Sequence, residues 1–272
     1  MRTCTLGILS DIHYAGAAER ARGHDYELRG IANPLARAFA AGFRRFVWLR
    51  DPLTKNFLLD QFLAQADGLD YVIANGDYSC NSAFVGLSDD AACESVRECL
   101  GRLRQRFGAR FRASYGDHEL GKFSMFGGQG GMRLASWQRA RHDLDMPPVW
   151  RLEIGRYVLL GFVSSLVALP VFATETLPVE RSEWERLRGE HLAEIRAAFA
   201  ALQPDQRMLL FCHDPTALPF LWREEGVRAR LSQIEMTIVG HLHSNLVLWK
   251  ARLLAGMPQI RFLGNTVRRY SF

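Results

Sequence analysis

The sequence predicts an α/β fold, because short apolar runs typical of buried strands alternate with longer runs of helical periodicity. The strand-like runs occupy residues 3–10, 70–74, 111–115, 207–212 and 236–239. Aspartate, histidine or both follow each of these runs within three residues. In open α/β sheets, sites are built at the carboxyl ends of the strands. The hydrophobic fraction of 48% and the charged fraction of 23% are typical of a globular protein, and we predict a single domain over residues 1–272.

The net charge and the cysteine content restrict the substrates and the cellular compartment that the sequence predicts. A net charge of +5 suits an anionic substrate or an acidic membrane surface, but by itself it does not indicate nucleic-acid binding. The five cysteines form no C-x-x-C pair, which predicts reduced thiols and a cytoplasmic protein. Cys4 and Cys212 lie in strand-like runs, so both are expected to be buried. The chain has no apolar run long enough for a transmembrane helix, and its N-terminal apolar run is too short for a signal peptide.

Two helical patterns follow the first strand and form a predicted insertion at 30–66. The first begins near Asn33-Pro34 and is rich in arginine, and its apolar residues are Leu35, Phe39, Phe43, Phe46, Val47 and Leu49. The second contains Phe57, Leu58, Phe62 and Leu63. Two interpretations remain open: the helices pack into the core, or a basic aromatic helix lies on a membrane or contacts a lipid-like substrate.

The middle of the chain contains one clear helix and one irregular stretch. Ser88-Asp89-Asp90 is expected to cap a helix over 91–107, with Leu100 and Leu103 facing inward. Residues 120–148 are expected to be an irregular, Gly-rich loop beside the site. Candidate anion contacts in this loop are Lys122, Arg133, Arg139 and Arg141.

The second half predicts a hairpin, helices and further strands. Residues 150–154 and 157–164 form a β-hairpin pattern joined at Gly155-Arg156. Ser182 and Glu185 match a capping box before an amphipathic helix, on which His191 is expected to face the core. Further predicted elements are a helix near 220–232 and closing strands at 246–250 and 259–263.

The side chains at the strand ends form a set of metal-competent donors. Carboxylates and imidazoles without thiolates suit Mn, Fe, Zn, Mg or Co. Eight such groups exceed the three or four of one catalytic metal site, and they suffice for two ions that share an aspartate. The set is Asp11, His13, Asp77, Asp117, His118, His213, His241 and His243.

The order of these motifs resembles the calcineurin-like metallophosphoesterase family. The motifs are S-D-I-H at 10–13, N-G-D at 75–77, G-D-H-E at 116–119, H-D-P at 213–215 and G-H-L-H at 240–243. The resemblance implies a four-layer α/β/β/α sandwich of two mixed β-sheets flanked by helices. It also implies hydrolysis of a phosphodiester, phosphomonoester or pyrophosphate bond by a metal-bound hydroxide, with two divalent metal ions as cofactors.

The resemblance implies a role for the residues of each motif. It implies that Asp11, His13 and His243 hold the first ion, that Asp77 bridges, and that Asp117, His213 and His241 hold the second. His118 would bind the phosphate and act as general acid. Position 117 is usually asparagine in the family, and an aspartate there would hold the metal more strongly yet repel a phosphate. We expect retained activity with an altered metal preference.

The expected partner is a phosphorylated small molecule or a lipid-linked substrate. The UDP-diacylglucosamine pyrophosphatases belong to this family, and the apolar, basic stretch 34–62 could hold acyl chains or contact a membrane peripherally. The sequence disfavours nucleic acid and implies no protein partner. The competing interpretation is a metal-free binding module that retains the fold without activity.

Overall fold

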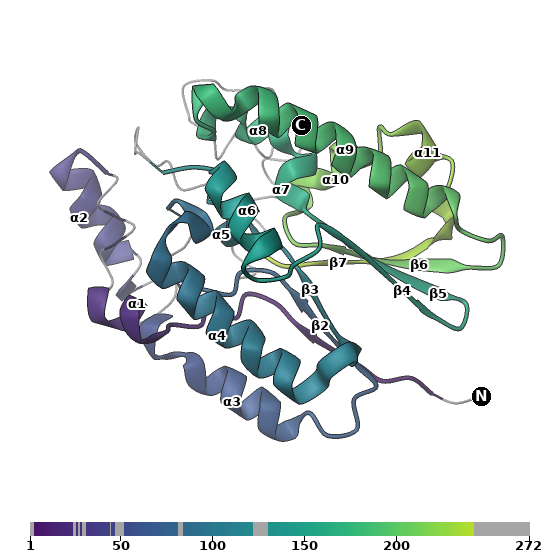
Figure 1. Cartoon of the computed structure of the whole chain (residues 1–272), viewed down its shortest axis with the longest axis horizontal. Helices are drawn as coiled ribbons and strands as arrows, with labels where there is room; N and C mark the ends of the chain where they lie inside the picture. The colour runs from purple at the N-terminus through teal and green to yellow at the C-terminus, as the bar shows by residue number, and fades with distance from the viewer. Residues whose placement is uncertain are drawn as a thin grey trace.

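The structure is a computed structural model that describes residues 3–23, 26, 28, 31–43, 45–46, 52–80, 84–121 and 130–241. Within these ranges the chain is a mixed α/β protein with two β-sheets flanked by helices (Figure 1). One sheet has the strand order β1-β2-β3 and the other has the order β4-β5-β6-β7. The strands are β1 Leu6–Leu9, β2 Tyr71–Asn75, β3 Phe111–Ser114, β4 Val149–Ile154, β5 Tyr157–Phe162, β6 Arg207–Cys212 and β7 Ile234–Val239.

Strand direction brings the functional motifs to one end of the molecule. The pairs β1–β2 and β2–β3 are parallel, as are β5–β6 and β6–β7. Only the β4–β5 pair among the described strands is antiparallel, and it forms the predicted hairpin. The carboxyl ends of parallel strands meet at the same edge of a sheet, so motifs that follow these strands lie close together.

The inner strands β2, β5 and β6 are largely buried on both faces, which explains why they are continuous apolar runs. Successive residues of a strand point to opposite faces. On β2, Val72 belongs to the main core cluster, whereas its neighbour Ile73 packs with Trp150, Leu159 and Phe211 of the other sheet. A hydrogen bond of 3.1 Å from Trp150 Nε1 to Ser114 Oγ also joins the two sheets.

Helices cover the outer sides of the sheets. In Figure 1, α3 and α4 lie below the sheets and α9, α10 and α11 lie above them. The helices are α1 Ala17–Arg22, α2 Pro34–Phe43, α3 Asn56–Gln65, α4 Asp90–Phe107, α5 Asp117–Leu120, α6 Leu134–His142, α7 Ser164–Val167, α8 Leu169–Phe172, α9 Arg181–Ala200, α10 Leu218–Leu221 and α11 Glu225–Arg228. No helix among the described residues has both the length and the apolar content to cross a membrane.

Helix α4 confirms its predicted cap, and α9 does not. The Asp89 side chain accepts a hydrogen bond of 2.9 Å from the Ala92 amide at the start of α4. Helix α9 begins at Arg181 directly after a 3-10 turn at Pro178–Glu180, so Ser182 lies inside its first turn. The predicted capping box is therefore wrong. His191 on α9 is buried as expected, and its Nε2 accepts a hydrogen bond of 3.1 Å from the Val163 amide.

Other predictions are also wrong in part. The stretch 120–148 contains helix α6, because Trp137 and Ala140 are buried one turn apart and stabilise a helix there. Strand β7 is not fully buried, since Met236 is 57% exposed. Cys4 is exposed and precedes β1, which begins at Leu6. The predicted helix near 220–232 is the end of α10 followed by the separate short helix α11.

Several predicted features lie outside the described residues. They are the closing strands at 246–250 and 259–263, most of the Gly-rich run, and the side chains of Lys122 and His243. The described residues do not test these features, which remain predictions.

Candidate metal centre

The two sheets converge at the carboxyl ends of their strands. His213, which follows β6, places its Nδ1 2.5 Å from the carbonyl oxygen of Asn75 at the end of β2. Gly240, which follows β7, donates its amide to the His213 carbonyl at 3.0 Å. The imidazoles of the second sheet therefore lie over the carboxylates of the first.

Four candidate ligand residues have an unusual backbone conformation. The φ angles are +55° at Asp11, +47° at His13, +60° at Asp77 and +68° at His241. Residues other than glycine rarely adopt this left-handed region, and each such residue costs of order 1–3 kcal/mol. Backbone hydrogen bonds from Asp11 to Gly76 and from His13 to Asp77 hold two of the turns. Concentration of strain at three neighbouring strand ends points to a functional site.

Glycines allow the turns to approach one another closely. A Cβ at Gly76, where φ is +93°, would lie 2.4 Å from the amide nitrogen of Gly116. A Cβ at Gly240 would lie 2.2 Å from Ser10 Oγ and 2.7 Å from His213 Nδ1. Both motif glycines are therefore needed for the side chains around them to converge.

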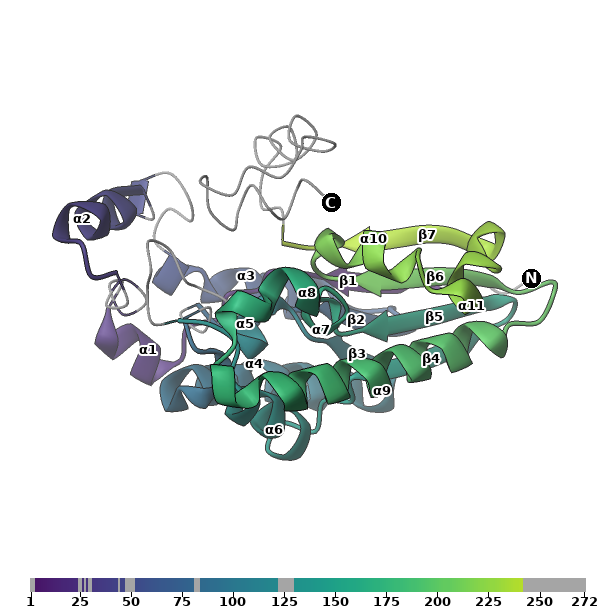
Figure 2. The ribbon, with the colours of Figure 1, turned by 90° about the horizontal axis from the view of Figure 1, so that it is seen from above.

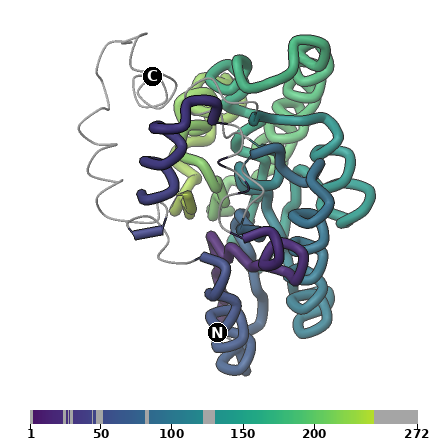
Figure 3. Tube along the Cα trace, turned by 90° about the vertical axis from the view of Figure 1, so that its left-hand side faces the viewer, coloured from purple at the N-terminus to yellow at the C-terminus, as the bar shows by residue number. Residues whose placement is uncertain are grey.

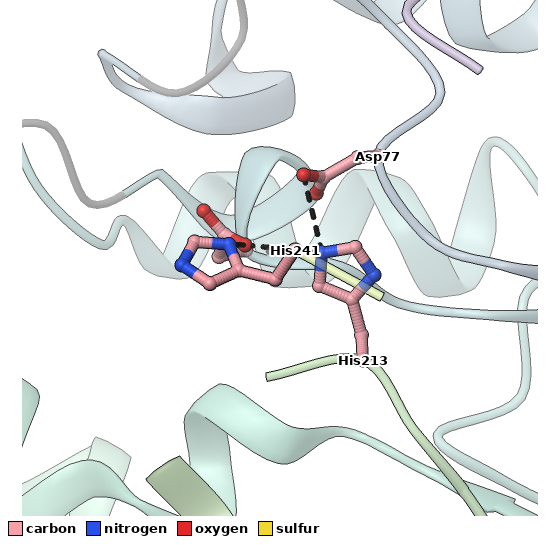
Figure 4. Close-up of side chains that lie close together, drawn as sticks. Asp77, His213 and His241 are labelled. Atoms are coloured by element: carbon pink, nitrogen blue, oxygen red, sulfur yellow. Dashed lines mark ion pairs between the residues drawn. The ribbon is translucent and has the colours of Figure 1, made fainter. Parts of the chain in front are cut away.

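The first group of donors contains Asp77, Asp117, His213 and His241. One ligand atom from each lies within 4.8 Å of the others. His213 Nε2 is 3.1 Å from Asp77 Oδ2 and 3.2 Å from Asp117 Oδ1, and His241 Nδ1 is 2.9 Å from Asp117 Oδ1. Figure 4 shows the His213 ring turned towards the Asp77 carboxylate, with the His241 ring on the neighbouring turn.

The second group of donors contains His13, Asp77 and His118, again within 4.8 Å of one another. His118 Nε2 lies 3.8 Å from Asp77 Oδ2, and the rings of His13 and His118 are 4.9 Å apart. Asp77 is common to both groups. The described residues thus provide two adjacent sets of donors joined by one carboxylate, which is the arrangement needed for a bridged metal pair.

Asp11 lies beside these groups and belongs to neither. Its carboxylate accepts the backbone amide of His241 at 3.0 Å and the Ser10 hydroxyl at 2.5 Å. Among the predicted substrate contacts, Arg133 donates to the carbonyl of Met132 at 3.0 Å. That contact ties Arg133 to its own loop, and its role towards a substrate stays a prediction.

The electrostatics of the centre favour bound positive charge. Burial and the Asp117 carboxylate act to raise the Asp77 pKa, but His118 and His213 outweigh them and hold it below its usual value. Burial opposes a charge on His213, but Asp77 and Asp117 outweigh burial and raise the His213 pKa well above its usual value. A proton on His213 therefore stabilises two buried carboxylates in the protein without metal.

The donor set fits divalent metal ions. It offers carboxylate and imidazole ligands without thiolate, in groups of three and four. Asp77 Oδ2 and His213 Nε2 are buried 3.1 Å apart, so each depends on the other while His213 carries its proton. A divalent metal ion would replace that proton and bind both atoms.

Glu119 is a site residue to which the sequence analysis gave no role. Its buried carboxylate accepts three backbone amides, from Asp77 and Tyr78 at 3.0 Å each and from Gly116 at 2.6 Å. Burial and the nearby Asp77 raise its pKa to about 7, although these three hydrogen bonds oppose the shift. The available signal was its place as the third residue of a helix, where glutamate reaches back to the capping amide.

Comparisons with known proteins add a distant likeness. No protein-family model matches the chain, and no curated protein matches it. Among solved structures, the chain is similar to the crystal structure of a dimetal phosphatase from Danio rerio. The identity is 16% and the TM-score is 0.42, over 86% of this chain and 79% of that chain.

Proposed function

We propose that this protein is a hydrolase that uses two divalent metal ions to cleave a phosphoric ester or pyrophosphate bond. The observation that supports the proposal is the position of Asp77 between the two groups of donors. When bound, two divalent ions would polarise a phosphoryl group and make water nucleophilic at neutral pH. The finer fold assignment, a four-layer α/β/β/α sandwich of the calcineurin-like type, belongs to the same proposal.

The residues of the first donor group would hold one ion. Ligand atoms of Asp117, His213 and His241 lie close to Asp77. Glu119 accepts the backbone amides of Asp77 and Gly116 and so fixes the two turns that carry the aspartates. For the second ion, His13 and Asp77 are in position, and the predicted ligands Asp11 and His243 would complete the set.

His118 would bind the phosphate and serve as the general acid. Its side chain is 14% exposed, so a substrate can reach it, whereas Asp77 is fully buried. Its amide donates to Asp77 Oδ1 at 3.0 Å, which fixes the residue beside the shared carboxylate. As the bond from phosphorus to the leaving oxygen breaks, the electron pair stays on that oxygen and His118 transfers its proton there.

Metal content and turnover, measured together, test this proposal. The purified protein, reconstituted with Mn, Fe, Zn, Mg or Co, should bind two ions per chain and hydrolyse a p-nitrophenyl phosphodiester. Absence of bound metal and of turnover with every ion would instead support a metal-free binding module.

A His118→Ala variant separates the two roles open to His118. As the acid, it should lower turnover by about 10²–10⁴-fold while both ions remain bound. Loss of an ion would make His118 a ligand. His142→Ala is the matched control, because His142 is an exposed histidine at the end of α6.

A second candidate substrate is a pyrophosphate linked to a lipid, as in UDP-diacylglucosamine hydrolysis. The exposed apolar side chains of α2 favour it, since Leu35 and Phe39 are available to contact an acyl chain. A panel of cyclic nucleotides, nucleoside diphosphate conjugates and lipid pyrophosphates distinguishes the candidates by their relative turnover.

A further inference from the structure

Helix α2 carries its large apolar side chains on the outside. Leu35, Phe39 and Phe43 are four residues apart and therefore share one face of the helix. They are 81%, 70% and 42% exposed, and Phe46 just beyond the helix is 71% exposed. We call these four residues the outer face of α2.

The opposite face of α2 is made of small residues. Ala36, Ala40 and Ala41 pack on Leu28 and Ile31 in a separate small cluster. Burial of a leucine or phenylalanine side chain contributes about 1.5–3 kcal/mol, far more than burial of an alanine. If α2 served only to stabilise the fold, the opposite orientation would be favoured.

Single exposed apolar residues also occur elsewhere on the protein, but the outer face of α2 combines four of them. Exposed residues such as Val179 and Met236 lie on distant elements. Four large apolar side chains on neighbouring turns form a contiguous patch, and such patches mark surfaces that bind a partner or a membrane.

The charge around α2 identifies the partner. From residue 28 to residue 50 the sequence contains Arg29, Arg37, Arg44, Arg45 and Arg50 and no aspartate or glutamate. Phenylalanine and leucine beside arginine are typical of helices that lie in the interface of an anionic bilayer. A two-fold contact between two copies would instead bring the same arginines together, so repulsion disfavours a second copy of this chain.

Helix α2 lies at the same end of the molecule as the candidate metal centre. In Figures 1 and 2 the N-terminus is at the right and α2 is at the far left, beyond the carboxyl ends of β1–β3. Figure 3 shows this end of the molecule facing the viewer.

We propose that α2 docks this protein on an anionic phospholipid surface, with Leu35, Phe39 and Phe43 inserted among the lipids. Arg45, just beyond the helix, contacts the headgroups. This inference stands apart from the proposed function, because docking needs neither a bound metal nor turnover.

Vesicle flotation tests the docking. The full chain should float with vesicles of phosphatidylcholine and phosphatidylglycerol, and more weakly with phosphatidylcholine alone. A Leu35→Asn, Phe39→Asn variant should lower the bound fraction at least about tenfold, since it removes the burial of two large apolar side chains. Both residues are exposed, so this variant should fold, and far-ultraviolet circular dichroism checks that it does.

Two further variants make the test specific. Val179→Ser removes an apolar residue that is 87% exposed on a distant element, and it should float like the wild type. Arg45→Gln should weaken binding to anionic vesicles only. Flotation unaffected by the double substitution would overturn the proposal. So would a wild-type dimer in light scattering that the double substitution converts to a monomer, because a second copy would then occupy the outer face.

Discussion

The Asp11 carboxylate accepts the backbone amide of His241 at 3.0 Å, although the two residues are 230 positions apart in the sequence. This contact joins the end of β1 to the end of β7 and thus links the two sheets across the candidate metal centre. Both residues have positive φ, so the contact also holds two strained turns in place.

Two substitutions of Asp11 distinguish the effect of its negative charge from its role as acceptor for the His241 amide. Asp11→Asn keeps an oxygen for the His241 amide, whereas Asp11→Ala leaves that amide without its acceptor. We expect Asp11→Ala to lower metal affinity by about 10–100-fold, and Asp11→Asn to lower it less. Metal titration of both purified variants measures this. Equal affinities in the two variants would contradict a positioning role for Asp11.

Asp117→Asn tests the departure from the resembling family. Asparagine keeps one carbonyl ligand within reach of His213 and His241 but removes a buried negative charge. We expect weaker binding of one ion, a changed order of preference among Mn, Fe, Zn, Mg and Co, and retained turnover. The measurement is turnover against metal concentration for each ion. An unchanged affinity together with an unchanged turnover would rule out the expected effect.

Gly76→Ala should destabilise the protein at the metal centre. The new Cβ would lie 2.4 Å from the amide nitrogen of Gly116. Residue 76 also has a φ of +93°, which alanine rarely adopts, so the turn must move. We expect a loss of at least about 1 kcal/mol in the free energy of unfolding, together with loss of metal.

Gly189→Ala is the matched control for Gly76→Ala. Gly189 lies in helix α9, and a Cβ there would meet nothing within 4 Å. Because alanine is the better helix former, this variant should gain about 0.5–1 kcal/mol. Urea unfolding measures the free energy of unfolding of both variants. Similar changes in the two variants would contradict the conclusion that Gly76 is needed for the close approach to Gly116.

His191 should make stability depend on pH. Burial lowers its pKa from 6.5 to about 3, although the hydrogen bond from Val163 opposes the shift. Between these values the unfolded chain binds a proton that the folded protein does not, so stability falls as the pH decreases from 6.5 towards 3. The contribution is fully present above pH 6.5.

The His191→Gln variant isolates this effect, because glutamine can still accept from the Val163 amide but does not titrate. Between pH 7 and pH 5 the wild type should lose about 2 kcal/mol more than the variant. Urea unfolding at both values measures the difference. Parallel losses would show that His191 is not the group responsible.

Much of the fold follows from local patterns in the sequence. The apolar runs at 70–74 and 207–212 correspond to β2 and β6, and the cap at Asp89 starts α4. The residues after the strands were recognised as one constellation because parallel strands end at a common edge. Asp77, Asp117, His213 and His241 do lie together in the structure.

What could not be predicted depends on contacts between distant residues. Periodicity showed that α2 has an apolar face but not that this face points outward, because only the packing of Ala36 and Ala40 on Ile31 sets its direction. Similarly, the three amides bound by Glu119 come from two different strand ends. The helix position of Glu119 predicts the contact with Gly116, but no local spacing predicts the contacts with Asp77 and Tyr78.

The central claim is that Asp77 lies between two metal ions, and anomalous diffraction from crystals grown with manganese tests it most directly. The account predicts two anomalous peaks per chain about 3.5–4 Å apart, with the Asp77 carboxylate between them. It also predicts that Asp77→Ala removes both peaks, whereas His241→Ala removes one. A single peak in the wild type, or two peaks that persist in Asp77→Ala, would contradict it.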